Sequence, residues 1–421
     1  MICEIILGLI IIFLVRITIL PAPKPILHVY RKPGRLYYVK VVVFYLLVKL
    51  RRWQDARTKK TGEKPDTLQA GYGATCVNNL DELEVPQKLA DHPKAIDAVF
   101  FQLANQSGQY LVAATARRPH KIINGFIYLA IPELGLLEAP KLPDTMLYAE
   151  KEEFAAEGLR IEPVVPNRTW KISYKGHMKY AKAPEKKVNV DIELEYNSKL
   201  RPFNFDTDMN AWTVARAMAK EPWSREYFQI LKDAHQTHYE QMGSASGRAI
   251  VDGKEFSLQL DGMRDHSYAY KREWKFMHRY GFHTITLQDG TRINAGFVSQ
   301  PVTCSRLELG YVYLPDGSLH ALDWIKLPLW ALGEGGTPPV DYGFTFKAAG
   351  KVWEVQVRVV HTPIFHIGWE WEAKLFERLC TYTVNGIPGW GVSEWHYRHA
   401  AGRPVEYAQN DPEWTNKIVK G

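Results

Sequence analysis

The sequence is poor in cysteine. Its 421 residues include four cysteines, and no two of them form a CxxC pair. Disulfide-stapled domains and thiolate zinc sites both need cysteines in regular, closely spaced sets, so neither is expected here. This cysteine usage fits a reducing compartment better than an oxidising one. The four positions are Cys3, Cys76, Cys304 and Cys380.

The motifs of nucleotide, hydrolase and metal chemistry are also missing. There is no GxGxxG after an expected strand, no Walker A loop and no GxSxG elbow. Two clusters hold metal-ligand residue types, namely His235, His238 and Glu240, and Asp206 with Asp208. The first lacks a further strong ligand, and the second lacks the Gly and terminal Glu of an EF-hand loop. We therefore predict no metal and no cofactor.

Positive charge is unevenly distributed along the chain. The formal net charge is +7, from 53 Lys and Arg against 46 Asp and Glu. The excess lies between residues 31 and 60, so the rest of the chain is near neutral and a nucleic-acid partner is not expected. The basic residues of this stretch are Arg31, Lys32, Arg35, Lys40, Lys49, Arg51, Arg52, Arg57, Lys59 and Lys60.

Long hydrophobic runs are confined to the start of the chain. Residues 2–20 are strongly apolar, but only Ile5 to Val15, between Glu4 and Arg16, is uninterrupted. A bilayer span needs about 20 residues, and Arg16 can extend the segment by reaching the interface. A secretory signal peptide normally has a positive start and a small-residue cleavage site, which are missing here. We therefore predict a membrane anchor over residues 1–20.

A second apolar segment, Leu36–Trp53, lies within a basic and amphipathic juxtamembrane region, residues 21–69. The alternatives are a second span, a re-entrant hairpin, an interfacial helix, or a helix docked on the body. Its aromatic and basic edges favour the interface. Positive charge after the first segment places the body in the cytosol. The prediction is a single-pass or hairpin anchor, with the endoplasmic reticulum membrane among the candidate locations.

The rest of the chain has the pattern of a mainly β protein. Alternating apolar positions indicate a first antiparallel barrel domain within residues 70–200. Residues 201–245 are rich in helix formers and predict a helical interlude. Residues 246–421 predict a second barrel, because a meander must close or pair its edges. Its hairpins are expected around Asp289-Gly290, Asp316-Gly317 and Ala348-Ala349-Gly350.

A dense polar stretch, Gly262–Trp274, follows directly on an alternating strand. Buried Asp or His costs several kcal/mol unless paired, so the stretch is either a structural strand-end network or a functional site. We expect Arg264, or else Arg272, to lie beside Asp265 and to hold its pKa low. On an extended chain alternate residues share a face, which places Arg264, His266 and Tyr268 on one side and Asp265 and Ser267 on the other.

Gly262–Tyr268 resembles the aromatic/His-x-Asp-His-x-Trp-Gly signature of the carotenoid 1,2-hydratase and AttH-like group. Further stretches resemble uncharacterised animal proteins, mainly of arthropods and nematodes, that have an N-terminal anchor and a lipocalin-like body. The animal resemblance covers nearly the whole chain from Ala70, whereas the hydratase resemblance is confined to the polar stretch and the architecture. The further stretches are Ala114–Glu138, Phe203–Trp212, Trp223–Gly243, Gly296–Val312 and Gly368–His399.

These resemblances imply a fold of two lipocalin-like (calycin) antiparallel barrels in tandem, with the helical interlude between them and the anchor helix in front. In the hydratase group the central Asp and His lie in the barrel as the acid/base pair that protonates an alkene. Asp265 and His266 match those positions. The chain departs from the pattern at Arg264, where His is usual, at Tyr268, where Trp is usual, and at Ala269, where Gly is usual.

Basic and aromatic side chains near the polar stretch and toward the C-terminus are candidate ligand contacts. Aromatic side chains suit an apolar cavity, although barrel cores use them as readily. The candidate ligand-binding residues are Arg264, Tyr268, Arg272, Trp274, Trp369, Trp371, Trp390 and Trp395.

Three functional hypotheses follow from the sequence. The leading one is a membrane-anchored binding protein for an apolar isoprenoid or lipid. The alternative is a hydratase, isomerase or cyclase that acts on a terpenoid-like alkene, with Asp265 as the acid and His266 as its partner. The third is a non-catalytic interaction protein at the membrane. The expected partners are a membrane and an apolar small molecule.

Overall fold

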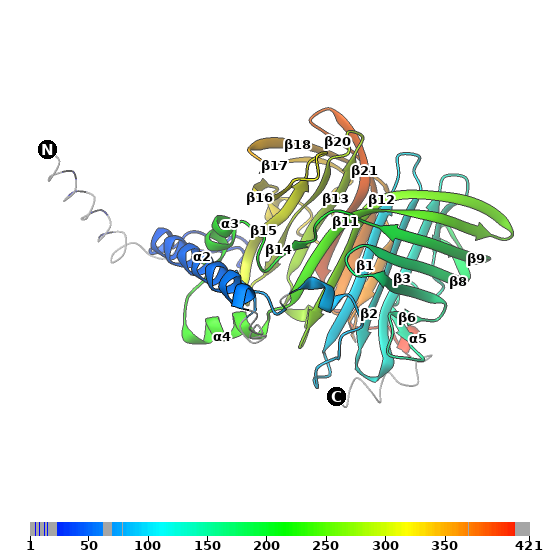
Figure 1. The fold of residues 1–421 in the computed structure, drawn as a ribbon, viewed down its shortest axis with the longest axis horizontal. Coiled ribbons are helices and arrows are strands. Elements are labelled where there is room, and N and C mark those ends of the chain that lie inside the picture. Colours follow the sequence, from blue (N-terminus) through cyan, green and yellow to red (C-terminus); the bar gives the residue numbers. More distant parts are fainter. Residues whose placement is uncertain are drawn as a thin grey trace.

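The computed structural model describes residues 23–61, 70–77, 79–368 and 370–408, together with the single residues 5, 8, 12 and 15. These residues form mainly β-strands, with a few helices (Figure 1). The expected membrane anchor, residues 1–20, lies outside the described residues apart from those four single positions. In the described ranges, no helix is both long enough and apolar enough to cross a membrane.

The second apolar segment forms helix α2 (Tyr37–Thr61), which is docked on the body along one face. Val41, Phe44 and Val48 of that face are buried. They pack in one hydrophobic cluster with residues of helix α3 (Ala211–Met218). The docked helix was one of the four alternatives that the sequence left open.

The first ring is a closed barrel of eight antiparallel strands. Each strand pairs with the next one along the ring, and the last, β12, pairs with the first, β1. Inward positions alternate with outward ones, and large side chains such as Trp170, Ile172 and Leu258 fill the interior. The strands are β1 (Ile96–Ala104), β2 (Tyr110–Arg118), β3 (Ile122–Ile131), β4 (Gly135–Glu138), β8 (Thr169–Tyr180), β9 (Ala183–Asn197), β11 (Thr237–Val251) and β12 (Lys254–Ala269).

Shorter strands and helices lie beside this ring. Strand β5 pairs with β3, β6 and β7 continue from β8, and β10 pairs with β11. A short 3₁₀ helix, η2, brings Glu84 to the ring, where the carboxylate is buried. The bounds are β5 (Met146–Tyr148), β6 (Ala155–Ala156), β7 (Leu159–Val165), β10 (Phe203–Asn204), η2 (Leu80–Leu83) and η3 (Pro119–Lys121).

The first ring extends further along the chain than the sequence division at residue 200 predicts. β11 pairs with β9, and β12 pairs with β1 in a register that joins Ile96 to Ala269. The polar stretch therefore begins on a strand of the first ring, which corrects the expectation that it belongs to the second. The helical interlude contains α3 and α4 (Arg225–Asp233), but residues 237–245 of it form a strand rather than a helix.

A second closed ring follows the same plan. Its strands pair in chain order, and the ring closes through the pairing of β18 with β20 and of β21 with β13. The three hairpins expected from the sequence join β13 to β14, β15 to β16 and β17 to β18, so they are confirmed. The strands are β13 (Arg279–Leu287), β14 (Arg292–Gln300), β15 (Cys304–Tyr313), β16 (Leu319–Lys326), β17 (Asp341–Ala348), β18 (Lys351–His361), β20 (Ala373–Val384) and β21 (Ile387–Arg398).

Three short helices and one short strand complete the described chain. Strand β19 pairs with β20 at the edge of the second ring. The elements are η4 (Trp274–Phe276), η5 (Leu329–Ala331), β19 (Ile364–Ile367) and α5 (Val405–Ala408).

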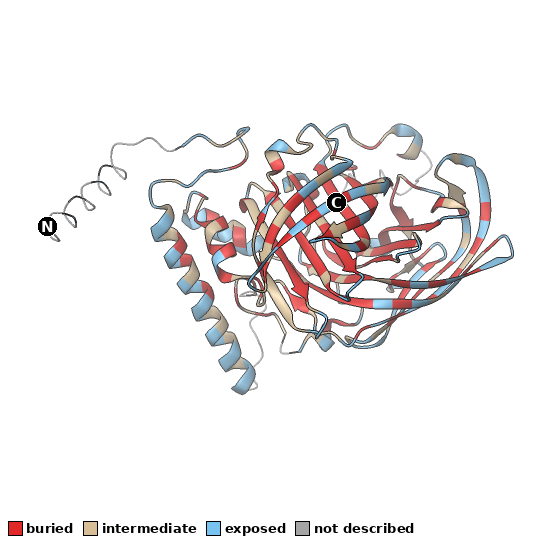
Figure 2. Cartoon of the chain, turned by 90° about the horizontal axis from the view of Figure 1, so that it is seen from above, coloured by how far each residue is buried: buried red, intermediate tan, exposed pale blue. Residues whose placement is uncertain are grey.

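The two rings lie side by side and share a buried layer, and the colouring by burial shows buried residues gathered in their strands (Figure 2). Phe126 of β3 packs on Phe365 of β19 with ring centroids 4.1 Å apart. The Tyr110 hydroxyl donates a hydrogen bond of 2.9 Å to the carbonyl oxygen of Cys380. Contacts of this kind hold the outer faces of the two rings against each other.

Candidate functional site

The alternation of strand β12 divides the polar stretch between two different environments. Arg264 and His266 point into the first ring, where both are buried. Asp265 and Ser267 point outward, into a cavity between the rings. The sequence predicted this separation of faces. Asp265 and His266 therefore do not form one acid/base pair, because the sheet of the first ring lies between their side chains.

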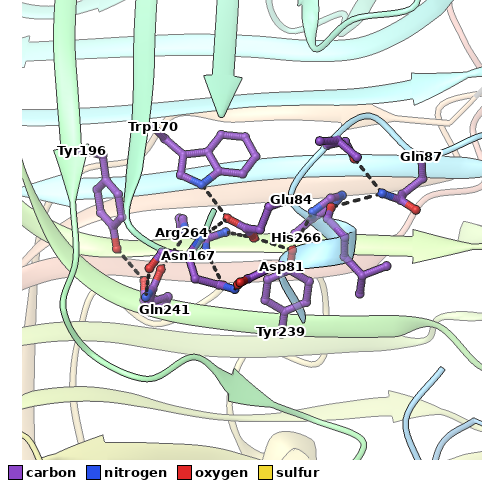
Figure 3. A network of polar contacts seen from close by, with 12 residues as sticks. Asp81, Glu84, Gln87, Asn167, Trp170, Tyr196, Tyr239, Gln241, Arg264 and His266 are labelled. Atoms are coloured by element: carbon purple, nitrogen blue, oxygen red, sulfur yellow. Dashed lines mark hydrogen bonds and ion pairs between the residues drawn. The ribbon is translucent and has the colours of Figure 1, made fainter. Parts of the chain in front are cut away.

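The inward residue Arg264 forms a buried ion pair with Glu84 (Figure 3). Its Nη1 lies 2.9 Å from Oε1 of Glu84, and its Nε donates to Oε1 of Gln241 at 3.0 Å. Glu84 also accepts hydrogen bonds from the indole N–H of Trp170 at 2.9 Å and from the Tyr239 hydroxyl at 2.5 Å. Burial alone raises the pKa of Glu84, but the Arg264 charge and these donors outweigh it and leave that pKa below its ordinary value.

The inward residue His266 belongs to the same buried network. Its Nε2 lies 2.6 Å from Oδ1 of Asp97, and its Nδ1 lies 2.9 Å from the Tyr239 hydroxyl. Asp97 in turn pairs with Arg117 at 2.6 Å. Every ring nitrogen of His266 thus has a protein partner inside the ring. This arrangement fixes η2 and neighbouring strands, so the geometry assigns His266 a structural role rather than a role as proton donor to a ligand.

A cavity of about 670 Å³ lies between the two rings and the helices. Strands β11 and β12 of the first ring and β13, β14, β15 and β21 of the second contribute to its wall, together with α2, α3 and α4. Its apolar lining includes Met218, Met263, Phe282, Val298, Leu307 and Leu309. Its polar lining includes Gln102, His238, Glu240, Asp265, Ser267, Arg272, Asn294 and Glu394.

Asp265 presents an acidic group to this cavity. Burial raises its pKa from 3.8 to about 6, although the positive charges of His238 and Arg272 act in the opposite direction. Among the described residues, no side chain donates a hydrogen bond to its carboxylate. Arg264, which we expected to lower this pKa, lies on the other face of β12 and pairs with Glu84 instead. Arg272, the second cation named from the sequence, does lie near Asp265 and lowers its pKa in part.

His238 and Glu240 form a second polar group in the cavity wall. His238 Nε2 lies 3.1 Å from Oε1 of Glu240, and its Nδ1 lies 2.6 Å from Oγ of Ser267. Burial lowers the pKa of His238, but Glu240 and the Asp265 charge outweigh this and raise it above the ordinary value. Asn294 of the second ring donates a hydrogen bond to the other oxygen of Glu240. The surroundings of His238 thus favour its protonated form beside Asp265.

Two further carboxyl groups meet where the rings touch. Gln102 of β1 donates to Oε1 of Glu377 at 2.6 Å and to Oε2 of Glu394 at 3.1 Å. The Tyr280 hydroxyl donates to Glu394 at 2.5 Å. Burial raises the pKa of Glu394 to about 7 and raises that of Glu377 well above its ordinary value, with the two negative charges opposing each other. The pair therefore holds a proton to a higher pH than ordinary carboxyl groups do, and Glu394 lines the cavity.

Only part of the candidate ligand set lines the cavity. Arg272 and Trp274 do, and Arg272 is held by a hydrogen bond of 2.6 Å from its Nε to Gln236. Tyr268 lies on the inward face and donates to the carbonyl oxygen of Lys88 at 3.1 Å. Arg264 is buried in the first ring, as described above.

The remaining tryptophans lie elsewhere. Trp371 stacks on His366 with ring centroids 4.2 Å apart, and Trp395 is buried inside the second ring. Trp390 packs in the layer between the rings without lining the cavity, and Trp369 lies outside the described residues. Aromatic content alone therefore did not distinguish core tryptophans from cavity tryptophans.

Sequence reasoning missed Gln102, Glu394 and the role of His238 and Glu240. The last two were expected on a helix, whereas on β11 their spacing of two residues places them on one face. This spacing of two residues was the signal in the sequence that could have placed both side chains on one face of a strand. No signal in the sequence identifies Gln102 and Glu394, because only the docking of the two rings brings them together. In the part of the chain that the structure describes, no three His, Cys, Asp or Glu side chains are grouped so as to hold a metal ion.

Solved structures with a similar arrangement of elements share little sequence with this chain. One is a putative AttH from Nitrosomonas europaea, with 12% identity, a TM-score of 0.45 and coverage of 75% of this chain and 99% of that one. Kievitone hydratase from Nectria haematococca gives 10% identity, a TM-score of 0.46 and coverage of 79% and 97%. The structure of CghA gives 11% identity, a TM-score of 0.44 and coverage of 76% and 96%.

A search of the curated proteins finds no match to this sequence. The sequence profile of a family of unknown function, DUF8627, matches residues 5–397. The chain therefore belongs to the family DUF8627.

Proposed function

We propose that the cavity between the rings binds an apolar small molecule of the isoprenoid or lipid class. The observation that carries this proposal is the cavity itself, about 670 Å³ in volume, with an apolar lining and a few polar groups gathered on β11, β12 and β21. Ligand cavities in proteins commonly have this size and this composition. In this proposal the rings are lipocalin-like barrels whose interiors are filled by side chains such as Trp170 and Trp395.

The test is to identify apolar compounds that the purified full chain retains, by organic extraction and mass spectrometry. Leu309→Trp adds volume to the cavity wall and is expected to abolish retention. Val164→Trp, at an exposed position of β7, is the matched control and is expected to retain the compound. The proposal fails if the wild type retains nothing, or if both variants retain the same compound in the same amount.

A second candidate function is acid catalysis on an alkene, and the position of Asp265 favours it. An acid that protonates a double bond must be neutral, near its substrate and shielded from water. Asp265 faces an apolar-lined cavity, and burial raises its pKa to about 6. Arg264, which would lower this pKa further, is turned away and paired with Glu84, whereas His238 and Arg272 lower it in part.

The reaction steps balance without an external reagent. The Asp265 carboxylic acid gives its proton to one alkene carbon, which leaves a carbocation and the Asp265 carboxylate. In hydration, water bonds to the cation and loses a proton to that carboxylate, so the net change is the addition of one water. In isomerisation, the carboxylate instead removes a proton from a carbon next to the cation. In cyclisation, a second double bond of the substrate first uses its π electrons to form a carbon–carbon bond to the cation, and the carboxylate then removes a proton next to the new cation. No oxidation occurs in any of these cases, and His238 and Glu394 contribute a polar wall around the reacting end.

Solvent deuterium tests this candidate. The full chain would be incubated in D₂O with geraniol, farnesol or geranylgeraniol, and carbon-bound deuterium would be measured by mass spectrometry. The wild type is expected to incorporate deuterium and Asp265→Asn is not. Asp261→Asn, the same change on the same strand at a partly exposed position, is expected to behave as the wild type. Absence of incorporation by the wild type, or equal incorporation by Asp265→Asn, would reject Asp265 as the acid.

A further inference from the structure

Helix α2 has an apolar face on each side. Val41, Phe44 and Val48 are buried against the body. The opposite side, called here the outer stripe, faces away from the body (Figure 2). Its members are between 40% and 58% exposed, and they are Val39, Val42, Val43, Leu46, Leu47, Leu50 and Trp53.

The outer stripe is a continuous surface. Its residues recur at intervals of three and four, which places them on one side of the helix over about 21 Å at 1.5 Å per residue. An exposed helix face of a soluble domain normally carries polar residues, and a large contiguous apolar patch marks an interaction site. The inner face of the helix already provides the packing on the body. Docking on the body therefore does not account for the outer stripe.

Basic residues within the helix lie beside the outer stripe rather than on it. Lys40 Nζ donates to the carbonyl oxygen of Glu221 at 2.8 Å, and Arg51 donates to that of Gly71 at 3.0 Å. Arg52 donates to the carbonyl oxygen of Met209. Lys49 and Arg57 are exposed and lie over the rings of Tyr45 and Trp53. The apolar surface is thus left free of charge and is bordered by cations.

Negative charge is almost missing from this part of the surface. Residues 23–61 contain one acidic residue, Asp55, which pairs with Lys59 at 3.0 Å. The exposed Lys and Arg residues of the same range are Lys24, Arg31, Lys32, Arg35, Lys49, Arg57, Lys59 and Lys60. An apolar face bordered by cations matches the boundary between anionic headgroups and acyl chains. A second copy of the chain fits less well, since stripe-to-stripe pairing would bring two basic borders together.

We propose that the outer stripe of α2 lies in the surface of an anionic membrane leaflet, with the helix axis parallel to the membrane. The helix lies on the membrane and does not span it. Its other side forms part of the cavity wall through Val48 and Arg52, so membrane binding brings the cavity next to the lipid surface. The cytosolic leaflet supplies the anionic lipids that this surface requires. This proposal is independent of the one for the cavity.

An environment-sensitive label on the outer stripe tests this inference in the full chain. Cys3→Ser and Cys76→Ser would be combined with Leu46→Cys, and the new thiol would be labelled with the NBD fluorophore, since Cys304 and Cys380 are buried. The matched control carries the label at Val164→Cys, an exposed apolar position on β7, which pairs with β8 of the first ring. Emission wavelength and quenching by iodide would be measured with phosphatidylcholine vesicles, with and without phosphatidylserine.

The expected result is a blue shift and a several-fold loss of iodide quenching at position 46 with phosphatidylserine vesicles, reduced by high salt, and no change at position 164. No shift at position 46, or equal shifts at both positions, would overturn the proposal. Shielding at position 46 before vesicles are added would also overturn it. Dependence of that shielding on protein concentration would then identify a second copy as the occupant, and independence would identify the apolar segment of residues 2–20.

Discussion

Asp265 is the residue whose burial has the clearest consequence for stability. Its pKa is about 6 in the folded protein against an ordinary 3.8, so the folded state binds the proton more tightly than the unfolded state. The contribution of Asp265 to stability is therefore most favourable below pH 4 and is lost as the pH rises through 6. A difference of about two pKa units corresponds to about 2–3 kcal/mol above pH 6. Burial of the ionised Asp265 carboxylate thus lowers stability at neutral pH.

We predict that Asp265→Asn stabilises the protein at neutral pH. Asn resembles the protonated acid, so the gain should be close to zero at pH 4 and reach about 2–3 kcal/mol at pH 7 and above. Denaturant unfolding between pH 4 and 8 measures it, with Asp261→Asn as the matched change at a partly exposed position of the same strand. A loss of stability at every pH would mean that Asp265 holds the strand in place.

Arg264 is predicted to act on stability alone. Its guanidinium and the Glu84 carboxylate are both fully buried, so Arg264→Leu leaves an unpaired charge inside the first ring. Removal of one partner of such a pair typically costs about 3–5 kcal/mol. A double-mutant cycle with Glu84→Leu measures the pairing, and the double variant should recover part of the loss. A loss in the double variant equal to the sum of the two single losses would show that the pair contributes nothing.

The sequence predicted the two faces of residues 264–268 from alternation, but it did not say which face lies inside a ring. That choice depends on Glu84 and Gln241, which are distant in the chain and meet Arg264 only after β11 and η2 are placed. The pKa of Asp265 was therefore expected in the wrong direction. Spacing shows which residues share a face, whereas their partners are a property of the fold.

Among the elements, β11 shows why the boundary of the first ring was misplaced. Over residues 237–243 most side chains of both faces are buried, one face in the ring and the other at the cavity. A strand buried on both faces loses the alternation of apolar and polar residues that identifies a strand in a sequence. The hairpins of the second ring, with Asp-Gly or Ala-Gly turns, kept clear signals and were predicted correctly.

Strand β12 is predicted to depend on glycine where it crosses β1. A Cβ added at Gly262 would lie 1.9 Å from the carbonyl oxygen of Gln102, so no room exists for a side chain. Gly262→Ala should lower the free energy of unfolding by about 1–3 kcal/mol, as overpacking does. Gly335→Ala is the control, because nothing lies within 4 Å of its added Cβ. Thermal or denaturant unfolding measures both, and equal stability of the two variants would contradict the close approach.

For the molecule as a whole, the sequence predicted a mainly β chain with closed meanders. It did not predict how the first ring closes or how the two rings dock. Closure of the first ring pairs Ile96 with Ala269, and no local pattern in the sequence predicts this contact. The cavity likewise lies between two rings and three helices. Each of these can be recognised in the sequence by itself, but the cavity between them cannot. Its residues, among them Gln102 and Glu394, become neighbours only when the rings dock. The ring interiors, where the hydratase resemblance implied an Asp and a His that act on an alkene, are filled by side chains.

The most direct test of the central claim, that the space between the rings holds the ligand, is photo-crosslinking of the full chain with a diazirine analogue of farnesol. Peptide mapping would locate the adducts, and excess farnesol would compete for specific sites. If the ligand lies between the rings, competed adducts are expected on the segments that contain Met263, Phe282 and Leu309. Competed adducts confined to the interior of the first ring, on the strands that carry Trp170 and Ile192, would contradict it.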